Sequence, residues 1–150
     1  MNYRNVLLVV CDLEESKKFY ADVLGLTVEV DFGANVTLTG GVCLQTIRSW
    51  QQLIGNQSVR LGGNAAELYF EEENFEAFVQ KLQQFDLEYV HEMTEQPWGQ
   101  QAVRFYDPDR HMIEVAEPMQ AVAQRFRAAG MTAEQIAARM DVPVAMVEQW

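Results

Sequence analysis

Apolar residues in this chain follow two spacings, and each spacing predicts one kind of element. The run from Val6 to Val10 is continuous and rich in β-branched residues, which is typical of a buried strand. Asp12 follows as a helix N-cap, with Glu15 three residues later, and apolar residues then recur at helical spacing until Gly25. This first stretch therefore predicts a strand and then a helix whose apolar stripe packs into a core.

The same order of elements continues and is then repeated. Short β-favouring runs after the helix predict strands over residues 26–31, 35–39 and 42–47. The second half predicts strands over residues 66–71, 87–91, 101–106 and 112–116, with a helix after Asn74 as its N-cap. Residues 49–64 have no clear period and predict a linker with a short helical turn at 50–54. Aligning Asp12 with Asn74 shifts the chain by 62 residues, so we interpret the halves as two copies of one βαβββ unit.

The last strands of the second half are joined by turn chemistry. In Asp107-Pro108-Asp109, proline fixes the backbone φ angle at the first turn position. The Asp side chains are expected to accept hydrogen bonds from nearby backbone N–H groups. His111 follows the turn, and we expect it to face solvent. The segment therefore predicts a hairpin.

The remaining residues, 118–150, predict three helices. The first covers 119–129, Thr132 and Gln135 form a capping box for the second, and Pro143 starts the third. Residues 132–148 resemble part of a helix-turn-helix. Over residues 118–150, Arg125, Arg127 and Arg139 are offset by Glu134, Asp141 and Glu148, and the last helix has no cation to read bases. We therefore expect a packing or dimerising role.

Charge and cysteine content limit the classes of partner and compartment. The 150 residues carry a net charge of −11, which argues against nucleic acid or an anionic membrane as the main partner. Cys11 and Cys43 form no CxxC pair, and we expect both to be small core residues. The N-terminal apolar run is too short for a signal sequence, so the expected location is the cytoplasm.

Four polar residues occupy matching places in otherwise apolar strands. Asn5 and Glu67 open the first strand of each half, and Gln45 and Glu114 lie in the fourth. Side chains alternate faces along a strand, so Glu114 points away from its apolar neighbours. This pattern predicts one cavity lined by all four side chains. The alternative is that they are solvent-exposed polar residues on a half-buried sheet.

Two motifs resemble those of a known family. The stretch from Asp12 to Gly25 is similar to the first helix of the vicinal oxygen chelate (VOC) superfamily, and Phe105 to Glu114 is similar to its closing hairpin. That superfamily includes glyoxalase I, bleomycin-resistance proteins and extradiol dioxygenases. The resemblance covers about residues 3 to 117. Within it, Glu67 to Phe70 and His91 to Gln100 are similar to motifs of bacterial glyoxalase-like proteins.

The resemblance implies a fold and a division of the chain. The implied fold is α+β, with paired βαβββ modules forming a curled mixed-sheet cup. The domain would cover residues 1–117, with modules at about 1–55 and 64–117, and residues 118–150 would be a helical C-terminal extension. A homodimer is also implied.

Carried over by position, the family's four metal ligands fall on Asn5, Gln45, Glu67 and Glu114. In glyoxalase I these are His, Glu, His and Glu, so only Glu114 keeps the family's residue. Two carboxylates and two amides make an oxygen-rich site, which favours Mg²⁺ or Mn²⁺ over Zn²⁺ or Ni²⁺. The alternative, left open at this point, is a site that holds no metal.

Two functions are compatible with these residues. One is a lactoylglutathione lyase-like lyase or isomerase that enolises a small oxygenated substrate, with Glu67 and Glu114 as metal ligands or catalytic bases. The other is a binding protein that sequesters a small molecule, as bleomycin-resistance members do. In either case we expect substrate contacts from Asn5 and Gln45 and from the stretch after the third strand, at His91, Glu95, Trp98 and Gln100. The alternative for Trp98 is that it covers the core.

Overall fold

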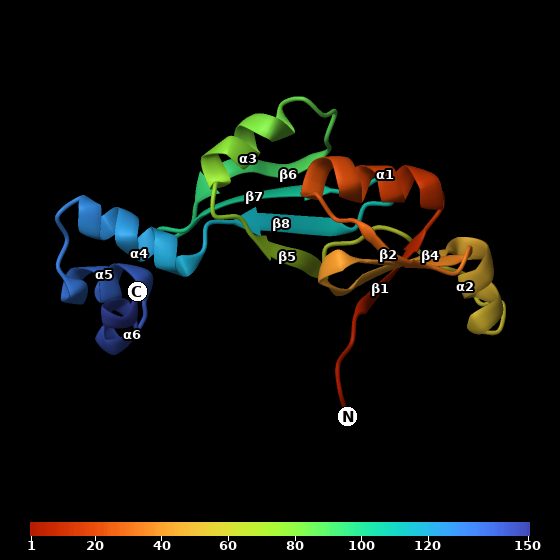
Figure 1. Cartoon of the computed structure of the whole chain (residues 1–150), viewed down its shortest axis with the longest axis horizontal. Helices are drawn as coiled ribbons and strands as arrows, with labels where there is room; N and C mark the ends of the chain where they lie inside the picture. Colours follow the sequence, from red (N-terminus) through yellow and green to blue (C-terminus); the bar gives the residue numbers. More distant parts are fainter. The chain divides into compact units, whose positions relative to one another are not determined.

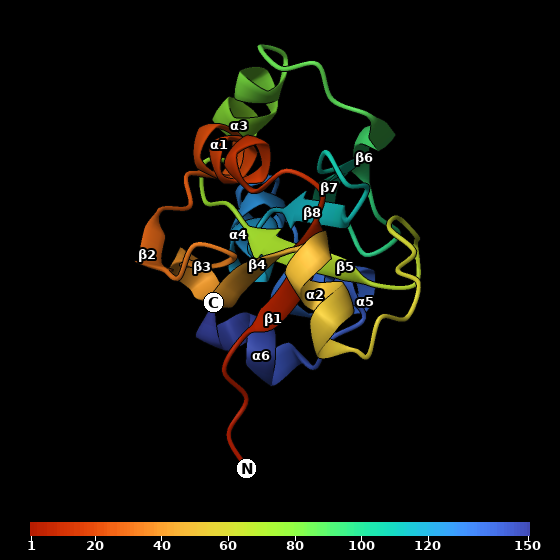
Figure 2. The same cartoon turned by 90° about the vertical axis from the view of Figure 1, so that its right-hand side faces the viewer.

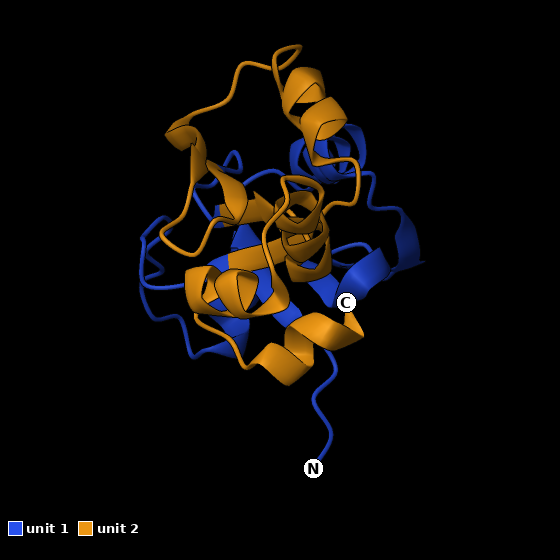
Figure 3. Cartoon of the chain, turned by 90° about the vertical axis from the view of Figure 1, so that its left-hand side faces the viewer, with its two compact units in different colours: residues 1–67, 106–112 blue, residues 68–105, 113–150 orange.

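The structure is a computed structural model that describes all 150 residues. The chain forms two compact units, which are described separately below (Figure 3). Unit 1 comprises residues 1–67 together with 106–112. Unit 2 comprises residues 68–105 together with 113–150.

Unit 1 is built on a mixed four-stranded sheet in the order β1-β4-β3-β2 (Figure 2). Strand β1 runs parallel to β4, whereas the pairs β4–β3 and β3–β2 are antiparallel. The elements are β1 (Val6–Val10), α1 (Leu13–Leu24), β2 (Val28–Asp31), β3 (Asn35–Leu38), the 3₁₀ turn η1 (Thr39–Gly41), β4 (Val42–Thr46) and α2 (Ile47–Leu53). The core includes Val10, Tyr20, Val36 and Leu44, all at 0% exposure.

Helix α1 begins and ends where its sequence predicts. The Asp12 side chain accepts hydrogen bonds from the backbone N–H groups of Glu14 (2.9 Å) and Glu15 (3.0 Å). Gly25 closes the helix in the left-handed conformation, at φ 72°, and its N–H bonds the last turn. Both ends are therefore set by local chemistry, which is why the sequence predicts them well.

The hairpin turn at 106–112 belongs to unit 1 and is organised around the buried Asp107. Its Oδ1 accepts from the backbone N–H groups of Asp109 (3.0 Å) and His111 (2.7 Å), as predicted for the turn. Its Oδ2 accepts from the hydroxyl of Tyr20 (2.9 Å) and lies 2.8 Å from His111 Nδ1. The prediction of a solvent-facing His111 was wrong in this respect, because the contact with Asp107 leaves the ring half-buried.

Unit 2 is built on a second four-stranded sheet, in the order β5-β8-β7-β6. Helix α3 lies against this sheet in Figure 1, and three further helices follow β8. The elements are β5 (Glu67–Glu71), α3 (Phe75–Leu82), β6 (Tyr89–Glu95), β7 (Gln101–Tyr106), β8 (Met112–Ala116), α4 (Met119–Ala128), α5 (Ala133–Met140) and α6 (Val144–Gln149). With the first sheet, this confirms the predicted α+β fold of two βαβββ modules with a helical C-terminal extension.

Three local predictions differ from the structure. Helix α2 covers Ile47–Leu53, so the helical turn predicted at 50–54 is present but begins three residues earlier, and Ile47 is helical where a strand was predicted. Strand β6 continues to Glu95, four residues beyond the predicted end, so the turn that follows it is shorter. Asn74 precedes α3 but makes no side-chain cap; its own N–H donates to Glu72 Oε1 instead (2.8 Å).

Helices α4, α5 and α6 enclose a small apolar core of their own. It contains six buried side chains, from Val122, Ala123, Ile136, Ala137, Met140 and Val147. The predicted capping box between Thr132 and Gln135 is present at the start of α5. The apolar stripes of these helices therefore bury one another. No helix of the chain combines the length and apolar character needed to cross a membrane.

Candidate functional site

One face of the unit 1 sheet carries neutral polar side chains. The pairs Asn35–Gln45 and Thr37–Cys43 lie opposite each other on β3 and β4. They alternate with Val36, Leu38 and Leu44, whose side chains are buried in the core. By strand alternation, the polar residues share the face that points away from that core.

Asn5 and Gln45, both predicted site residues, lie on this sheet with their amides already bonded. Asn5 Nδ2 donates to Cys43 Sγ (2.9 Å), and Thr37 Oγ1 lies 3.3 Å from the same sulfur. Gln45 is 6% exposed; its Oε1 accepts from Asn35 Nδ2 (2.8 Å) and its Nε2 donates to Ser49 Oγ. Cys43 is buried as predicted, but it is part of this polar row.

Cys11 does not match its prediction as a core residue. Its side chain is exposed, directly after β1. Its backbone N–H donates to both carboxylate oxygens of Asp109 (3.1 and 3.0 Å). A hydrogen bond with Asp109, followed by partial burial and the carboxylate charge, raises the pKa of the Cys11 thiol. A thiol with a raised pKa is a poor nucleophile at neutral pH.

In unit 2, Glu114 is buried and paired with a cation. Its side chain is 5% exposed, and its neighbours Ile113 and Val115 are also buried. Its Oε2 forms an ion pair with Arg104 Nη2, and this oxygen accepts no hydrogen bond of regular geometry. The alternative of a solvent-exposed Glu114 is therefore wrong.

His91 extends this ion pair into a row across three neighbouring strands, β6, β7 and β8. His91 lies opposite Arg104 in the β6–β7 register, and Arg104 Nη1 lies 3.0 Å from His91 Nε2. The other ring nitrogen lies 2.8 Å from the backbone carbonyl oxygen of Glu92. Because a carbonyl can only accept, we assign the proton to Nδ1, which leaves Nε2 to accept from the guanidinium.

The residues at the four family positions do not fit a divalent metal. In neither unit does a group of three or more His, Cys, Asp or Glu side chains lie where it could hold one. Neutral amides are weak metal ligands, and both amides here bond other protein groups. A cation at Glu114 would also meet Arg104; at an effective dielectric constant near 20, two unit charges about 4 Å apart interact by about 4 kcal/mol. Glu67, the first residue of β5, is exposed.

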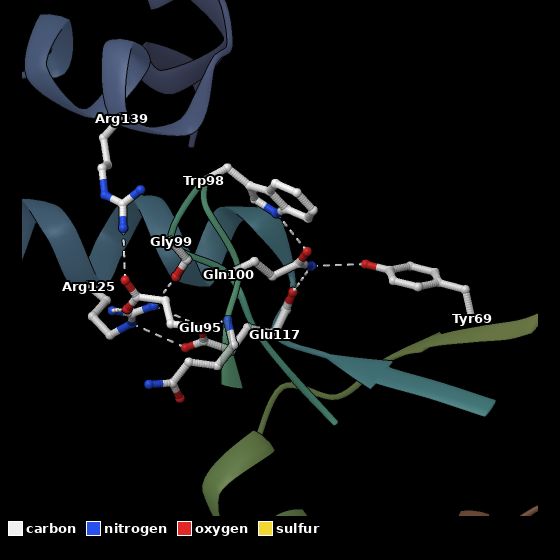
Figure 4. Close-up of polar contacts among 9 residues, drawn as sticks. Tyr69, Glu95, Trp98, Gly99, Gln100, Glu117, Arg125 and Arg139 are labelled. Carbon is white, nitrogen blue, oxygen red and sulfur yellow. Dashed lines mark hydrogen bonds and ion pairs between the residues drawn. The ribbon is translucent and has the colours of Figure 1, made fainter. Parts of the chain in front are cut away.

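Glu95, Trp98 and Gln100, predicted to contact substrate, form bonds within unit 2 (Figure 4). Trp98 Nε1 donates to Gln100 Oε1 (3.0 Å). Gln100 is 4% exposed, and its Nε2 donates to the hydroxyl of Tyr69 (3.0 Å) and to the carbonyl oxygen of Glu117 (2.7 Å). Trp98 as a residue remains 36% exposed.

The loop after β6 is also bound by the C-terminal helices (Figure 4). Arg125 on α4 donates to the carbonyl oxygen of Gly99 (2.6 Å) and to Glu117 Oε2 (2.9 Å). Arg139 on α5 donates to Glu95 Oε1 (2.8 Å) and to the carbonyl oxygen of Pro97. Glu95 and the backbone of this loop therefore anchor the helices, a role that was not predicted for them.

Arg104 is the residue that sequence reasoning missed. It interrupts an apolar strand pattern between Val103 and Phe105, as Glu114 does between Ile113 and Val115. Two opposite charges in apolar strands joined by a tight turn were a signal that the two side chains pair. The same reasoning applies less clearly to Asn35, since a polar residue at the start of a strand is common.

The fold is that of the glyoxalase/bleomycin resistance/dioxygenase class, the VOC superfamily. A model of the glyoxalase-like domain family matches residues 3–120, so the chain belongs to that family. The match ends at the beginning of α4, and most of the C-terminal helices lie outside it.

Solved structures with this fold include proteins of different description. A protein of unknown function from Agrobacterium tumefaciens is 38% identical, with a TM-score of 0.72 over 79% of this chain and 94% of that chain. A glyoxalase-related enzyme from Fulvimarina pelagi is 18% identical, with a TM-score of 0.68 over 78% and 88%. A lactoylglutathione lyase from Agrobacterium tumefaciens is 21% identical, with a TM-score of 0.58 over 77% and 92%. A search of curated proteins returned no match.

Proposed function

We propose that this protein binds a small polar or planar molecule without a metal ion and releases it chemically unchanged. The observation that carries the proposal is the donor set of the unit 1 sheet face. Asn5, Asn35 and Thr37 carry amide and hydroxyl groups there, and the buried Gln45 holds Asn35 in place. Amides and hydroxyls have several donor and acceptor sites, so those left over can recognise a ligand by hydrogen bonds. Such groups give orientation and specificity, but none of them is a strong base or nucleophile.

The second candidate is the metal-assisted lyase or isomerase. It is favoured by Glu114, a buried carboxylate at a position where the family has a metal ligand. Desolvation of a carboxylate favours proton transfer near neutral pH. The paired guanidinium of Arg104 opposes this function, because it neutralises the carboxylate and repels a metal ion.

A screen with the full-length protein tests the proposal. After treatment with EDTA, we would follow thermal unfolding in the presence of planar aromatic compounds and of thiol adducts of α-keto aldehydes. A compound that binds the native state raises the unfolding midpoint. NMR of the incubated mixture would then show whether the compound is recovered intact.

The expected result is a shift without chemical change, and a weaker shift in Gln45→Ala. Gln52→Ala, on the exposed side of α2, is the matched control and should behave as the wild type. The lyase would be the correct function if the compound is consumed only after a divalent ion is added. In that case the Glu114→Gln variant should no longer consume it.

A further inference from the structure

We propose that Arg104 takes the place of the divalent metal ion in this chain, as the resident cation that neutralises Glu114. This inference deepens the metal-independent function proposed above and rests on it. The experiment for this inference measures metal uptake and stability, whereas the proposed function is tested by ligand binding. Failure of the inference can therefore be distinguished from failure of the proposed function.

The position of Arg104 supports this assignment. It lies on β7, between β8 with Glu114 and β6 with His91, and its guanidinium contacts both side chains. A metal ion held through Glu114 Oε2 would compete with Arg104 Nη2, which already contacts that oxygen. The guanidinium therefore supplies positive charge at a carboxylate that could otherwise hold a metal.

Burial favours a cation at this place. The Glu114 side chain is 5% exposed and the Arg104 side chain is 23% exposed. A carboxylate removed from water stays ionised when it has a partner of opposite charge, whether that partner is a metal ion or a side chain. In this chain the partner is covalently part of the protein, so the site is complete without added ions.

His91 is oriented for the guanidinium. Its Nδ1 faces the carbonyl oxygen of Glu92 (2.8 Å), which directs the lone pair of Nε2 at Arg104 Nη1 (3.0 Å). An imidazole nitrogen is the commonest metal ligand in proteins. Here it accepts a hydrogen bond from a cation that is covalently part of the protein. The row His91–Arg104–Glu114 is therefore an internal charge network in place of a metal centre.

The test uses four forms of the full-length protein, wild type, Arg104→Met, Arg104→Lys and the double variant Arg104→Met/Glu114→Gln. Methionine keeps the length of the side chain and removes its charge, and lysine keeps the charge. Each form is stripped with EDTA, and thermal unfolding is followed with and without MnCl₂ at about 1 mM. Bound Mn²⁺ is measured independently by electron paramagnetic resonance.

We expect the wild type and Arg104→Lys to show neither a Mn²⁺-dependent shift nor bound Mn²⁺. Arg104→Met should unfold at a midpoint lower by roughly 10 °C, because it leaves a buried carboxylate unpaired. Mn²⁺ should recover several degrees of this loss. The double variant should be more stable than Arg104→Met and should not respond to Mn²⁺, since it lacks the carboxylate. If Arg104→Met does not fold without metal, folding restored by added Mn²⁺, with a double variant that folds without it, supports the same conclusion.

Three results would overturn the proposal. The first is stoichiometric Mn²⁺ on the wild type. The second is an Arg104→Met variant that is destabilised but not recovered by Mn²⁺, which would leave Arg104 as an ordinary ion-pair partner. The third is a double variant no more stable than Arg104→Met.

Discussion

Single residues in unit 1 show how one buried polar group ties distant segments together. Asp107 accepts hydrogen bonds from its own turn and from the hydroxyl of Tyr20 on α1. The Tyr20 side chain is fully buried, and burial, followed by the negative charge of Asp107, raises its pKa well above the ordinary value of 10.0. This contact therefore links the hairpin turn to the first helix and couples stability to alkaline pH.

Tyr20→Phe should lower the free energy of unfolding by about 1–3 kcal/mol at neutral pH, because the buried carboxylate loses a donor. The wild type should also lose stability as the pH rises above about 10, since the unfolded phenol releases its proton there and the folded one retains it. Urea unfolding at pH 7 to 11 measures both effects. The alkaline loss should be smaller in Tyr20→Phe and unchanged in Tyr3→Phe, whose residue is 83% exposed. An equal alkaline loss in all three proteins would contradict this assignment.

At the level of elements, the loop between β6 and β7 depends on close contact with α4. Gly99 has φ +91°, and a side chain there would overlap the ring of Phe126. Arg125 and Arg139 both lie over that ring, with guanidinium carbons 5.0 and 5.9 Å from its centroid. Glycine at this position therefore allows the loop backbone to approach the helix.

Gly99→Ala should destabilise the protein by about 2–3 kcal/mol, from overpacking against Phe126 and from left-handed backbone strain. Gly130→Ala is the matched control, with φ +88° and no atom within 4 Å of an added Cβ. It should cost only the strain, about 1 kcal/mol. Thermal unfolding of both variants measures the difference, and equal losses would mean that the contact with Phe126 contributes nothing.

For the molecule as a whole, the C-terminal helices are an addition to the family domain. Ion pairs attach these helices to the domain. The chain has an excess of acidic residues and a net charge of −11. Arg125 and Arg139 on these helices form ion pairs with two of the acidic residues, Glu95 and Glu117. The helices have their own apolar core, so their attachment to the loop is separable from their folding. These contacts account for the packing role expected of this segment.

Arg125→Ala should loosen this attachment, because the largely buried Glu117 loses its cation and Gly99 loses a donor. The expected loss is about 1–2 kcal/mol, since the Arg125 side chain is 36% exposed and partly screened by solvent. Limited trypsin digestion read by mass spectrometry should show faster cleavage after Arg127 and Arg139. Arg48→Ala, on an exposed residue of α2, should leave the digestion pattern unchanged; the same pattern in Arg125→Ala would argue against a charge-held attachment.

The sequence by itself determined the elements whose ends depend on neighbouring residues. The cap of α1 at Asp12, its end at Gly25, the Asp107 turn and the Thr132 capping box were all predicted, because each uses bonds within a few residues. The order of elements along the chain followed from the apolar pattern, whereas the order of strands within each sheet came from the structure. The predicted cap at Asn74 was wrong, because its side chain accepts no hydrogen bond from the helix and its own N–H donates to Glu72.

Only the tertiary structure decided the partners of the site residues. Strand alternation placed Glu114 away from Ile113 and Val115, but it could not show that Arg104 neutralises it. Likewise, the polarity of Glu95 and Gln100 indicated contacts without showing that α4 and the end of β8 supply them. The physical reason is range: hydrogen bonds within a turn are set by local backbone geometry, whereas charge pairing between strands and helices depends on how the chain packs.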